Sequence, residues 1–263
     1  MSEENNPVRY ERIEDVAVLT LNDPEKMNPL SDAMRTALLT RLEEAIADYD
    51  VRTIVLTGAG GNFTSGADIR QLGLGGPNDP LRSRRRLMPL HRTIELIAGG
   101  PKPVIGAIEG AVFGAGLSFA TACDYLIISE TARFGASFGK IGLTADCGLM
   151  WSLPQRIGRT MARDLMFTGR AVKADEAIAI GLADRKVEAG GALAAALAKA
   201  AEYRGVAPLA IAAMKSAFVA GPAPLDDVLA LERQQQPMMS MTEDHAEGIA
   251  AFREKREARF KAR

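Results

Sequence analysis

Several features that would point to a particular class of function are scarce in this 263-residue chain. It holds two cysteines, Cys123 and Cys147, which are too few for a disulfide framework and lack the CxxC spacing of a zinc site. Its two histidines have no paired serine to complete a nucleophilic triad. The net charge of −1 argues against a nucleic-acid partner. This cysteine usage fits a reducing, cytoplasmic setting best.

Long apolar runs and phosphate-binding glycine motifs are also missing. No run reaches the roughly 18 apolar residues that cross a bilayer, so we expect no membrane association. The polar start, residues 1–6, is unlike a signal or transit peptide. GxxxxGK[ST] does not occur, and the pairs Gly58-x-Gly60 and Gly114-x-Gly116 fail at the third glycine of GxGxxG. The sequence therefore disfavours a nucleotide-binding module.

Predicted strands alternate with predicted helices over the first part of the chain. Four apolar, β-branched runs are typical of buried strands: 16–21, 53–57, 104–108 and 125–129. A helix is expected over 32–49, with Ser31 as its N-cap. A loop over 71–83 precedes a helix over 84–98, in which Pro89 marks the start or a kink. From about 159 the pattern is mostly helical. This order indicates an α/β core with a helical C-terminal appendage, which should dock on the core or on another subunit.

Two stretches of small residues, 63–69 and 110–116, each follow an apolar run and precede an expected helix. Small residues at such junctions leave backbone N–H groups uncovered. Two N–H groups aimed at one point can hold a developing oxyanion, so the pair suggests enolate or acyl chemistry. The alternative for 110–116 taken alone is tight packing of a helix against a strand.

The sequence resembles the crotonase (enoyl-CoA hydratase/isomerase) superfamily over nearly its full length. Five stretches carry the resemblance in the family's order: 21–30 (LNDPEKMNPL), 63–69 (FTSGADI), 101–110 (PKPVIGAIEG) through Cys123-Asp124, 134–148 (FGASFGKIGLTADCG) and 247–256 (EGIAAFREKR). It implies an α/β crotonase (ClpP-like) spiral of ββα units. The spiral core with the CoA cleft would span 1–200, and a helical segment for trimerisation and CoA capping would span 201–263.

The resemblance also implies partners and site residues. The substrate would be an acyl-CoA thioester, bound without a separate cofactor by a homotrimer or a dimer of trimers. The N–H groups of Ala67 and Ala115 would form the oxyanion hole. CoA would meet Lys26, Met27, Ser65, Ala67, Asp68, Ile69, Arg70, Phe252 and Lys255, the last two across a subunit boundary. The basic run 84–86 either adds to the mouth of this cleft or is a solvated helix start.

Two departures from the family pattern bear on the reaction. Hydratases of this family use two glutamates to activate water, and the aligned positions hold Ser118 and Phe138. Neither side chain can act as a general acid or base near neutral pH. Asp146 remains in the expected neighbourhood, and the segment 134–148 resembles the ring-opening isomerases of phenylacetate catabolism. A single carboxylate suits an isomerase, which removes a proton at one carbon and returns it at another.

A carboxylate in this role needs a pKa raised by apolar neighbours. The candidates are Leu143, Leu149, Met150 and Trp151. The alternative is that Asp146 caps a helix that begins near Cys147. We expect an enoyl-CoA isomerase, with a divergent hydratase and a non-catalytic acyl-CoA-binding protein as alternatives. His91 is expected to pack inside a helix interface, His245 to lie on the surface, and Cys147 to be a buried filler rather than a nucleophile.

Overall fold

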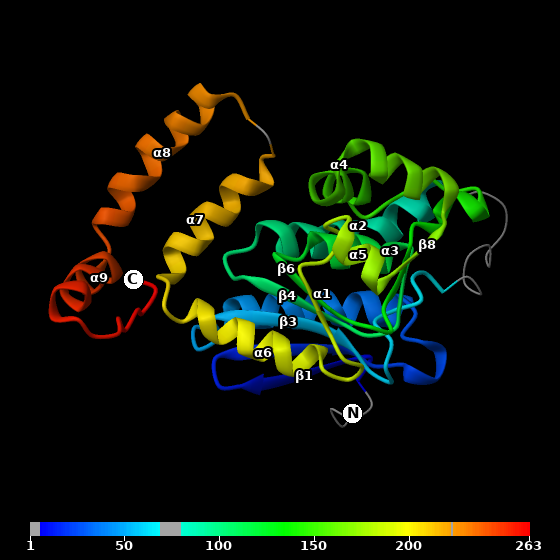
Figure 1. The fold of residues 1–263 in the computed structure, drawn as a ribbon, viewed down its shortest axis with the longest axis horizontal. Helices are drawn as coiled ribbons and strands as arrows, with labels where there is room; N and C mark the ends of the chain where they lie inside the picture. The colour runs from blue at the N-terminus through cyan, green and yellow to red at the C-terminus, as the bar shows by residue number, and fades with distance from the viewer. Residues whose placement is uncertain (1–5, 69–79, 222) are drawn as a thin grey trace.

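The fold is described by a computed structural model covering residues 6–68, 80–221 and 223–263. Its larger sheet has the strand order β1 (Val8–Ile13), β2 (Val16–Leu21), β3 (Thr53–Gly58), β4 (Val104–Ile108), β6 (Tyr125–Ser129) and β9 (Arg185–Val187). The β1–β2 pair is antiparallel, and every other neighbouring pair is parallel. Such parallel pairing needs crossover connections, which here are the helices that cover the sheet (Figure 1).

Both faces of the larger sheet are buried, which explains the nearly continuous apolar runs of its strands. In β2, Ala17, Leu19 and Leu21 belong to the main core, whereas Val16 and Val18 belong to a second core on the other face. The main core is closed by α1 (Asp32–Ala47), α2 (Pro80–Gly99), α3 (Ala115–Ala122) and α4 (Leu149–Thr168). The second core is closed by the alanines of α6 (Ala192–Tyr203).

A smaller sheet has the order β5 (Ala111–Phe113), β7 (Arg133–Gly135) and β8 (Ala171–Lys173). An isolated parallel bridge between Thr64 and Val112 ties the first small-residue stretch to β5. The remaining short elements before α6 in the described residues are η2 (Pro24–Lys26), η3 (Ser137–Ile141) and α5 (Ala174–Ala179). The smaller sheet thus places the second small-residue stretch beside the first, which positions the candidate site.

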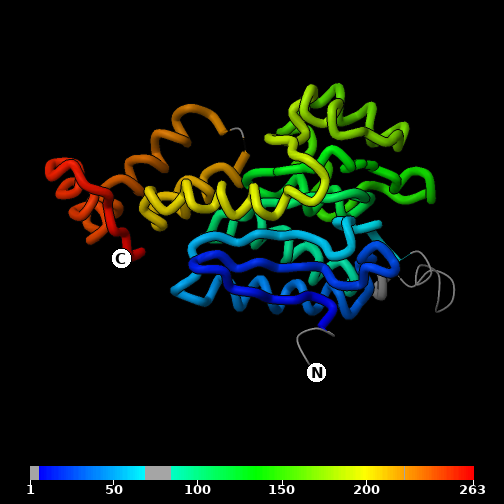
Figure 2. Tube along the Cα trace, turned by 60° about the horizontal axis from the view of Figure 1, so that its bottom comes forward, coloured from blue at the N-terminus to red at the C-terminus, as the bar shows by residue number. Residues whose placement is uncertain are grey.

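The C-terminal helices are α7 (Pro208–Val219), α8 (Leu225–Ser240) and α9 (Glu243–Glu254). Helix α7 lies against α2, while α8 and α9 stand away from both sheets at the left of both views (Figures 1 and 2). The Arg52 guanidinium ties this segment to the core by donating to the carbonyls of Arg204 and Phe260. Large apolar side chains on α8 and α9 are exposed, among them Leu225, Val228, Leu229, Ile249 and Phe252. Within the described residues, no helix is long and apolar enough to span a membrane.

The predicted strands and helices are confirmed in type and differ in extent. Of the loop expected over 71–83, residues 71–79 lie outside the described residues, and 80–83 belong to α2. Ser31 is the N-cap of α1, and its hydroxyl accepts a hydrogen bond from the Met34 N–H at 3.2 Å. Helix α2 begins at Pro80 rather than at 84, because proline suits the first helical turn. Pro89 lies inside α2 and does not start it. The expected helical region after 159 was incomplete: α4 begins earlier, at Leu149, and two three-residue strands, β8 and β9, follow it.

Candidate active site

The two small-residue stretches lie side by side. The Thr64 N–H donates to the Ala111 carbonyl at 2.9 Å, and the Phe113 N–H donates to the Thr64 carbonyl at 3.2 Å. Glycine makes this approach possible at two points. A Cβ on Gly66 would lie 2.5 Å from the Phe113 carbonyl oxygen, and a Cβ on Gly116 would lie 2.3 Å from Thr64 Cγ2. The tight packing expected as the alternative for 110–116 is therefore present. The same packing brings the two small-residue stretches together.

Ala67 and Ala115 occupy the ends of these adjoining stretches. Ala115 is the first residue of α3, so its N–H has no partner within the helix. Gly114 precedes it with φ 54° and ψ −125°, a conformation that favours glycine and turns the chain sharply into the helix. Among the described residues, neither the Ala67 N–H nor the Ala115 N–H has a hydrogen-bond acceptor. Two donors on neighbouring segments are thus left for an external oxygen.

Asp146 lies in a tight turn between η3 and α4. The turn passes through Cys147 (φ 50°) and Gly148 (φ 74°), and the Asp146 carbonyl accepts a hydrogen bond from the Leu149 N–H at 3.1 Å. A left-handed conformation at a residue such as Cys147 costs about 1–2 kcal/mol. Backbone strain of this kind persists where the surroundings hold it in place, and it concentrates at functional sites.

The Asp146 carboxyl group is half-buried, and its Oδ1 atom is fully buried with no hydrogen-bond partner in the described residues. Burial raises the pKa of this carboxyl group, while a hydrogen bond from Cys147 and the charges of Arg86, His91 and Arg35 lower it in part. A buried polar atom without a partner is costly and calls for an explanation. It fits a group that meets a substrate.

The chain as a whole matches known proteins of one family. The family model described as "Enoyl-CoA hydratase/isomerase" matches residues 11–263. The chain belongs to the enoyl-CoA hydratase/isomerase family. The observed two sheets and C-terminal helices are the crotonase fold of this family: the chain superposes on the crystal structure of an enoyl-CoA hydratase from Polaromonas sp. JS666 with a TM-score of 0.90, at 32% identity, covering 96% of this chain and 99% of that one.

Relatives in the family carry different names. A Thermus thermophilus protein is 38% identical over 93% of this chain and 97% of its own length, and its name provisionally assigns it to the enoyl-CoA hydratases. The Escherichia coli protein named 1,2-epoxyphenylacetyl-CoA isomerase is 34% identical over 93% of this chain and 94% of its own length. The short-chain-enoyl-CoA hydratase of Clostridium acetobutylicum is 34% identical over 96% of this chain and 97% of its own length. The family is shared, and the names divide between hydratase and isomerase.

The two positions that the resemblance aligns with the hydratase glutamates were expected to be Ser118 and Phe138, and both side chains are buried. Ser118 in α3 is fully buried, and its hydroxyl donates to the Asp146 carbonyl at 3.0 Å. Phe138 in η3 is also buried, and its Cζ lies 4.0 Å from where a Cβ on Gly114 would be. Both positions therefore border the candidate site, and neither supplies an ionisable group. The bond from Ser118 to Asp146 was not predicted, because nothing in the sequence pairs two residues so far apart.

The expected apolar surround of Asp146 is only partly correct. Leu149 is fully buried, but Leu143, Met150 and Trp151 are exposed by 46%, 60% and 38%. The alternative that Asp146 caps a helix beginning near Cys147 is also wrong. Helix α4 begins at Leu149 with Gly148 as its N-cap, and no side chain caps it. The Asp146 side chain therefore does not cap α4, and its Oδ1 has no hydrogen-bond partner in the described residues.

The structure also shows where the cysteine, histidine and arginine candidates lie. Cys147 is buried, and burial next to Asp146 raises the pKa of its thiol, so it stays protonated and is a poor nucleophile, as expected. The packing prediction for His91 is wrong: its side chain is exposed on α2, and its charge acts on Asp146. His245 is exposed, as predicted. In the basic run, Arg84 and Arg85 are exposed and Arg86 is half-buried.

The residues expected near CoA fall into two groups. Lys26 and Met27 lie beside the first turn, because the Met27 carbonyl accepts a hydrogen bond from the Ser65 N–H at 2.8 Å. Asp68 follows on the same turn and is half-buried. The predicted Ile69 and Arg70 lie outside the described residues. Phe252 and Lys255 lie at the end of α9, at the opposite end of the molecule from α3 (Figures 1 and 2), so one copy of the chain does not bring the two groups together.

Asn28 holds the first turn in place, a role that sequence analysis missed. Its side chain is fully buried, and its amide donates to three carbonyls, those of Ala59, Asn62 and Phe63, at 2.8–3.2 Å. The backbone carbonyl of Asn28 accepts a hydrogen bond from the Thr64 hydroxyl at 2.6 Å. Its left-handed φ of 51° is a conformation that asparagine tolerates better than most residues. Asn28 lies in the 21–30 stretch that carries the family resemblance, but nothing in that stretch indicates which carbonyls its side chain meets.

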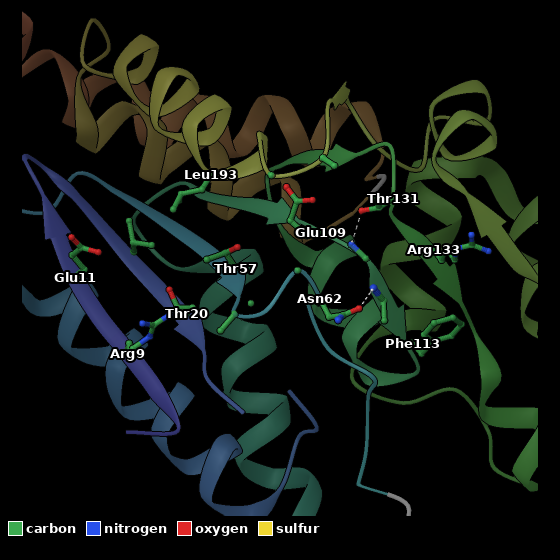
Figure 3. A pocket seen from close by; sticks show the side chains of 18 of the residues that line it. Arg9, Glu11, Thr20, Thr57, Asn62, Glu109, Phe113, Thr131, Arg133 and Leu193 are labelled. Atoms are coloured by element: carbon green, nitrogen blue, oxygen red, sulfur yellow. Dashed lines mark hydrogen bonds between the residues drawn. The ribbon is translucent and has the colours of Figure 1, made fainter. Parts of the chain in front are cut away.

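The pocket shown in Figure 3 lies apart from these groups. It measures about 930 Å³ and opens between β1, β2 and β3 on one side and β5 and β7 on the other. None of the predicted site residues lines it. Asn62 lines it and also accepts a hydrogen bond from the Ala111 N–H at 3.0 Å, so the pocket borders the back of the two turns.

Proposed function

We propose that this protein is an enoyl-CoA isomerase that shifts a carbon–carbon double bond of an acyl-CoA thioester, with Asp146 as the proton shuttle. The observation that carries the proposal is the Asp146 carboxyl group with its buried, unpartnered Oδ1. Both positions at which family hydratases have glutamates hold side chains that cannot move a proton, Ser118 and Phe138. One carboxylate is sufficient for an isomerisation and insufficient for a hydration that uses two.

In the proposed mechanism the thioester oxygen accepts hydrogen bonds from the N–H groups of Ala67 and Ala115. The Asp146 carboxylate removes a proton from C2 of a 3-enoyl-CoA, and the electrons of that C–H bond form a dienolate whose charge rests on the thioester oxygen. The resulting carboxylic acid returns the proton to C4, which leaves the double bond between C2 and C3. The composition of the acyl-CoA is unchanged. Burial supports this role, because a raised pKa makes the carboxylate a better base.

CoA in this proposal is held by two copies of the chain. Lys26, Met27, Ser65, Asp68 and the neighbouring Ile69 and Arg70 would bind it from one copy. Phe252 and Lys255 would meet its nucleotide end from another, because in their own chain they lie far from the first turn. The exposed apolar side chains of α8 and α9 support a homotrimer or a dimer of trimers, with residues from 201 onward as the assembling segment.

The names of relatives support two readings of the same site. The isomerase name of the E. coli relative favours the proposal. The hydratase name of the Clostridium relative keeps a divergent hydratase as the second candidate. A third candidate, a non-catalytic acyl-CoA-binding protein, is suggested by the loss of both glutamates.

The deciding experiment assays the purified protein with two substrates at equal enzyme concentration. Crotonyl-CoA reports hydration, and 3-hexenoyl-CoA reports isomerisation to the 2-enoyl ester. The proposal expects a much larger kcat/KM for isomerisation. A larger value for hydration would establish the hydratase instead. Binding of a CoA thioester in calorimetry without turnover of either substrate would establish the binding protein.

A further inference from the structure

The turn that carries Asp146 is clamped from two sides. On one side, the Ser118 hydroxyl of α3 donates to the Asp146 carbonyl at 3.0 Å. On the other, Gly148 abuts α2, where a Cβ on Gly148 would lie 3.3 Å from Ile94 Cγ2. Two consecutive left-handed residues, Cys147 and Gly148, form the turn between these contacts. A turn of this kind with a cysteine at its first central position is unfavourable by itself and depends on its surroundings.

Ser118 joins this turn to the proposed oxyanion hole. It lies one helical turn after Ala115 in α3, and its side chain is fully buried. The hydroxyl therefore fixes the distance between the helix whose first N–H would bind the thioester oxygen and the residue that would move the proton. The Asp146 carbonyl oxygen accepts this bond together with the one from the Leu149 N–H, so both bonds hold the backbone and leave the carboxylate Oδ1 without a partner in the described residues.

We propose that Ser118 is a positioning residue, which holds the Asp146 turn against α3 so that the carboxylate stays aligned with an acyl group bound at Ala67 and Ala115. The serine thus replaces a family glutamate with a structural link to a different carboxylate. This inference rests on the proposed isomerase function and adds to it the residue that sets the alignment. Ser118 itself transfers no proton and does not touch the substrate.

Helix α3 offers a matched control one turn further on. The Thr121 hydroxyl is also buried and lies within hydrogen-bond distance of the backbone carbonyls of Leu117 (2.9 Å) and Ser118 (3.2 Å). It also shares a 2.7 Å hydrogen bond with the Ser152 hydroxyl of α4. It makes no bond to the Asp146 turn. Thr121→Val and Ser118→Ala therefore each remove one buried hydroxyl from the same helix, and only the second frees the turn.

The experiment compares isomerase kinetics and thermal unfolding for Ser118→Ala, Thr121→Val and Asp146→Asn. Small misalignments of a reacting group lower rates steeply, so we expect Ser118→Ala to lower kcat for 3-hexenoyl-CoA about tenfold to a hundredfold with KM nearly unchanged. Thr121→Val should lower the unfolding temperature by a similar amount and keep kcat. If Ser118→Ala does not fold, Ser118→Cys, which keeps a weak donor, should show a smaller fall in kcat with the same KM.

Two results would overturn the positioning role. One is a kcat for Ser118→Ala equal to that of Thr121→Val. The other is an effect of Ser118→Ala confined to KM. In either case an inactive Asp146→Asn variant would leave the isomerase function standing. Wild-type kcat in Asp146→Asn would instead overturn the proposed function itself, whatever Ser118→Ala does.

Discussion

Gly116 of α3 lies directly against Thr64 of the first turn, where any β-carbon would come within 2.3 Å of Thr64 Cγ2. We expect this contact to hold together the two turns that carry Ala67 and Ala115. Gly116→Ala should therefore push the two turns apart, lower kcat by about a hundredfold and destabilise the fold by about 1–3 kcal/mol. Steady-state kinetics and denaturant unfolding measure both effects. Gly205→Ala is the control, because a Cβ there meets only the Glu202 carbonyl, at 3.8 Å. Equal kcat values for the two variants would show that this contact does not set the site geometry.

The acidic limb of the pH–rate profile should report the Asp146 carboxyl group. Burial raises its pKa and the Arg86 charge lowers it, so Arg86→Gln should raise that pKa further. Because the base works in its ionised form, activity falls as pH drops through the pKa, and the limb should move to higher pH in the variant. Arg92→Gln is the control, since Arg92 lies on the same helix, is exposed and pairs with Glu95. A limb that moves equally in both variants, or in neither, would argue against Asp146 as the titrating group.

The same carboxyl group should cost stability at neutral pH. Its folded-state pKa is raised above that of the unfolded chain, so the folded state binds more protons between the two pKa values. Stability therefore falls as pH rises through that window, and ionised Asp146 opposes folding above it. Asp146→Asn should unfold at a higher temperature than wild type at pH 7, with the difference shrinking at pH values below the window. A lower unfolding temperature at pH 7 would mean that the carboxylate has a stabilising partner.

Phe252 should act at a neighbouring copy of the chain. Its side chain is 87% exposed, at the far end of the molecule from the proposed oxyanion hole. Light scattering should show an assembly of several copies, and Phe252→Ser should raise KM for the acyl-CoA more than it lowers kcat. Tyr49→Ser is the control, because Tyr49 is a fully exposed aromatic residue on the core. A monomeric wild-type protein with full activity would contradict a site shared between copies.

The fold was largely predictable because its strands and caps are local signals. The apolar runs at 16–21 and 104–108 became β2 and β4 with those bounds, and Ser31 caps α1. The strands β8 and β9 were not predicted, because a strand of three residues is too short to show an alternating apolar pattern.

The sequence indicated which residues to consider for the candidate site, but it did not indicate which of them contact each other. The two turns followed from their small residues, and Asp146 followed from the resemblance. The bond from Ser118 to Asp146 joins residues 28 positions apart and depends on how α3 packs. His91 was expected to be packed because it lies between apolar neighbours, yet its position on α2 turns it to solvent. Burial of this kind is set by which helix covers which face, and sequence spacing leaves that choice open.

The most direct measurement is the kcat of Asp146→Asn for isomerisation of 3-hexenoyl-CoA, with the affinity for a CoA thioester measured on the same protein by calorimetry. Loss of a general base lowers rates by about a hundredfold to ten-thousandfold, so kcat should fall by at least about a hundredfold while the affinity stays within about twofold of wild type. A variant that keeps wild-type kcat would contradict the assignment of Asp146 as the residue that moves the proton.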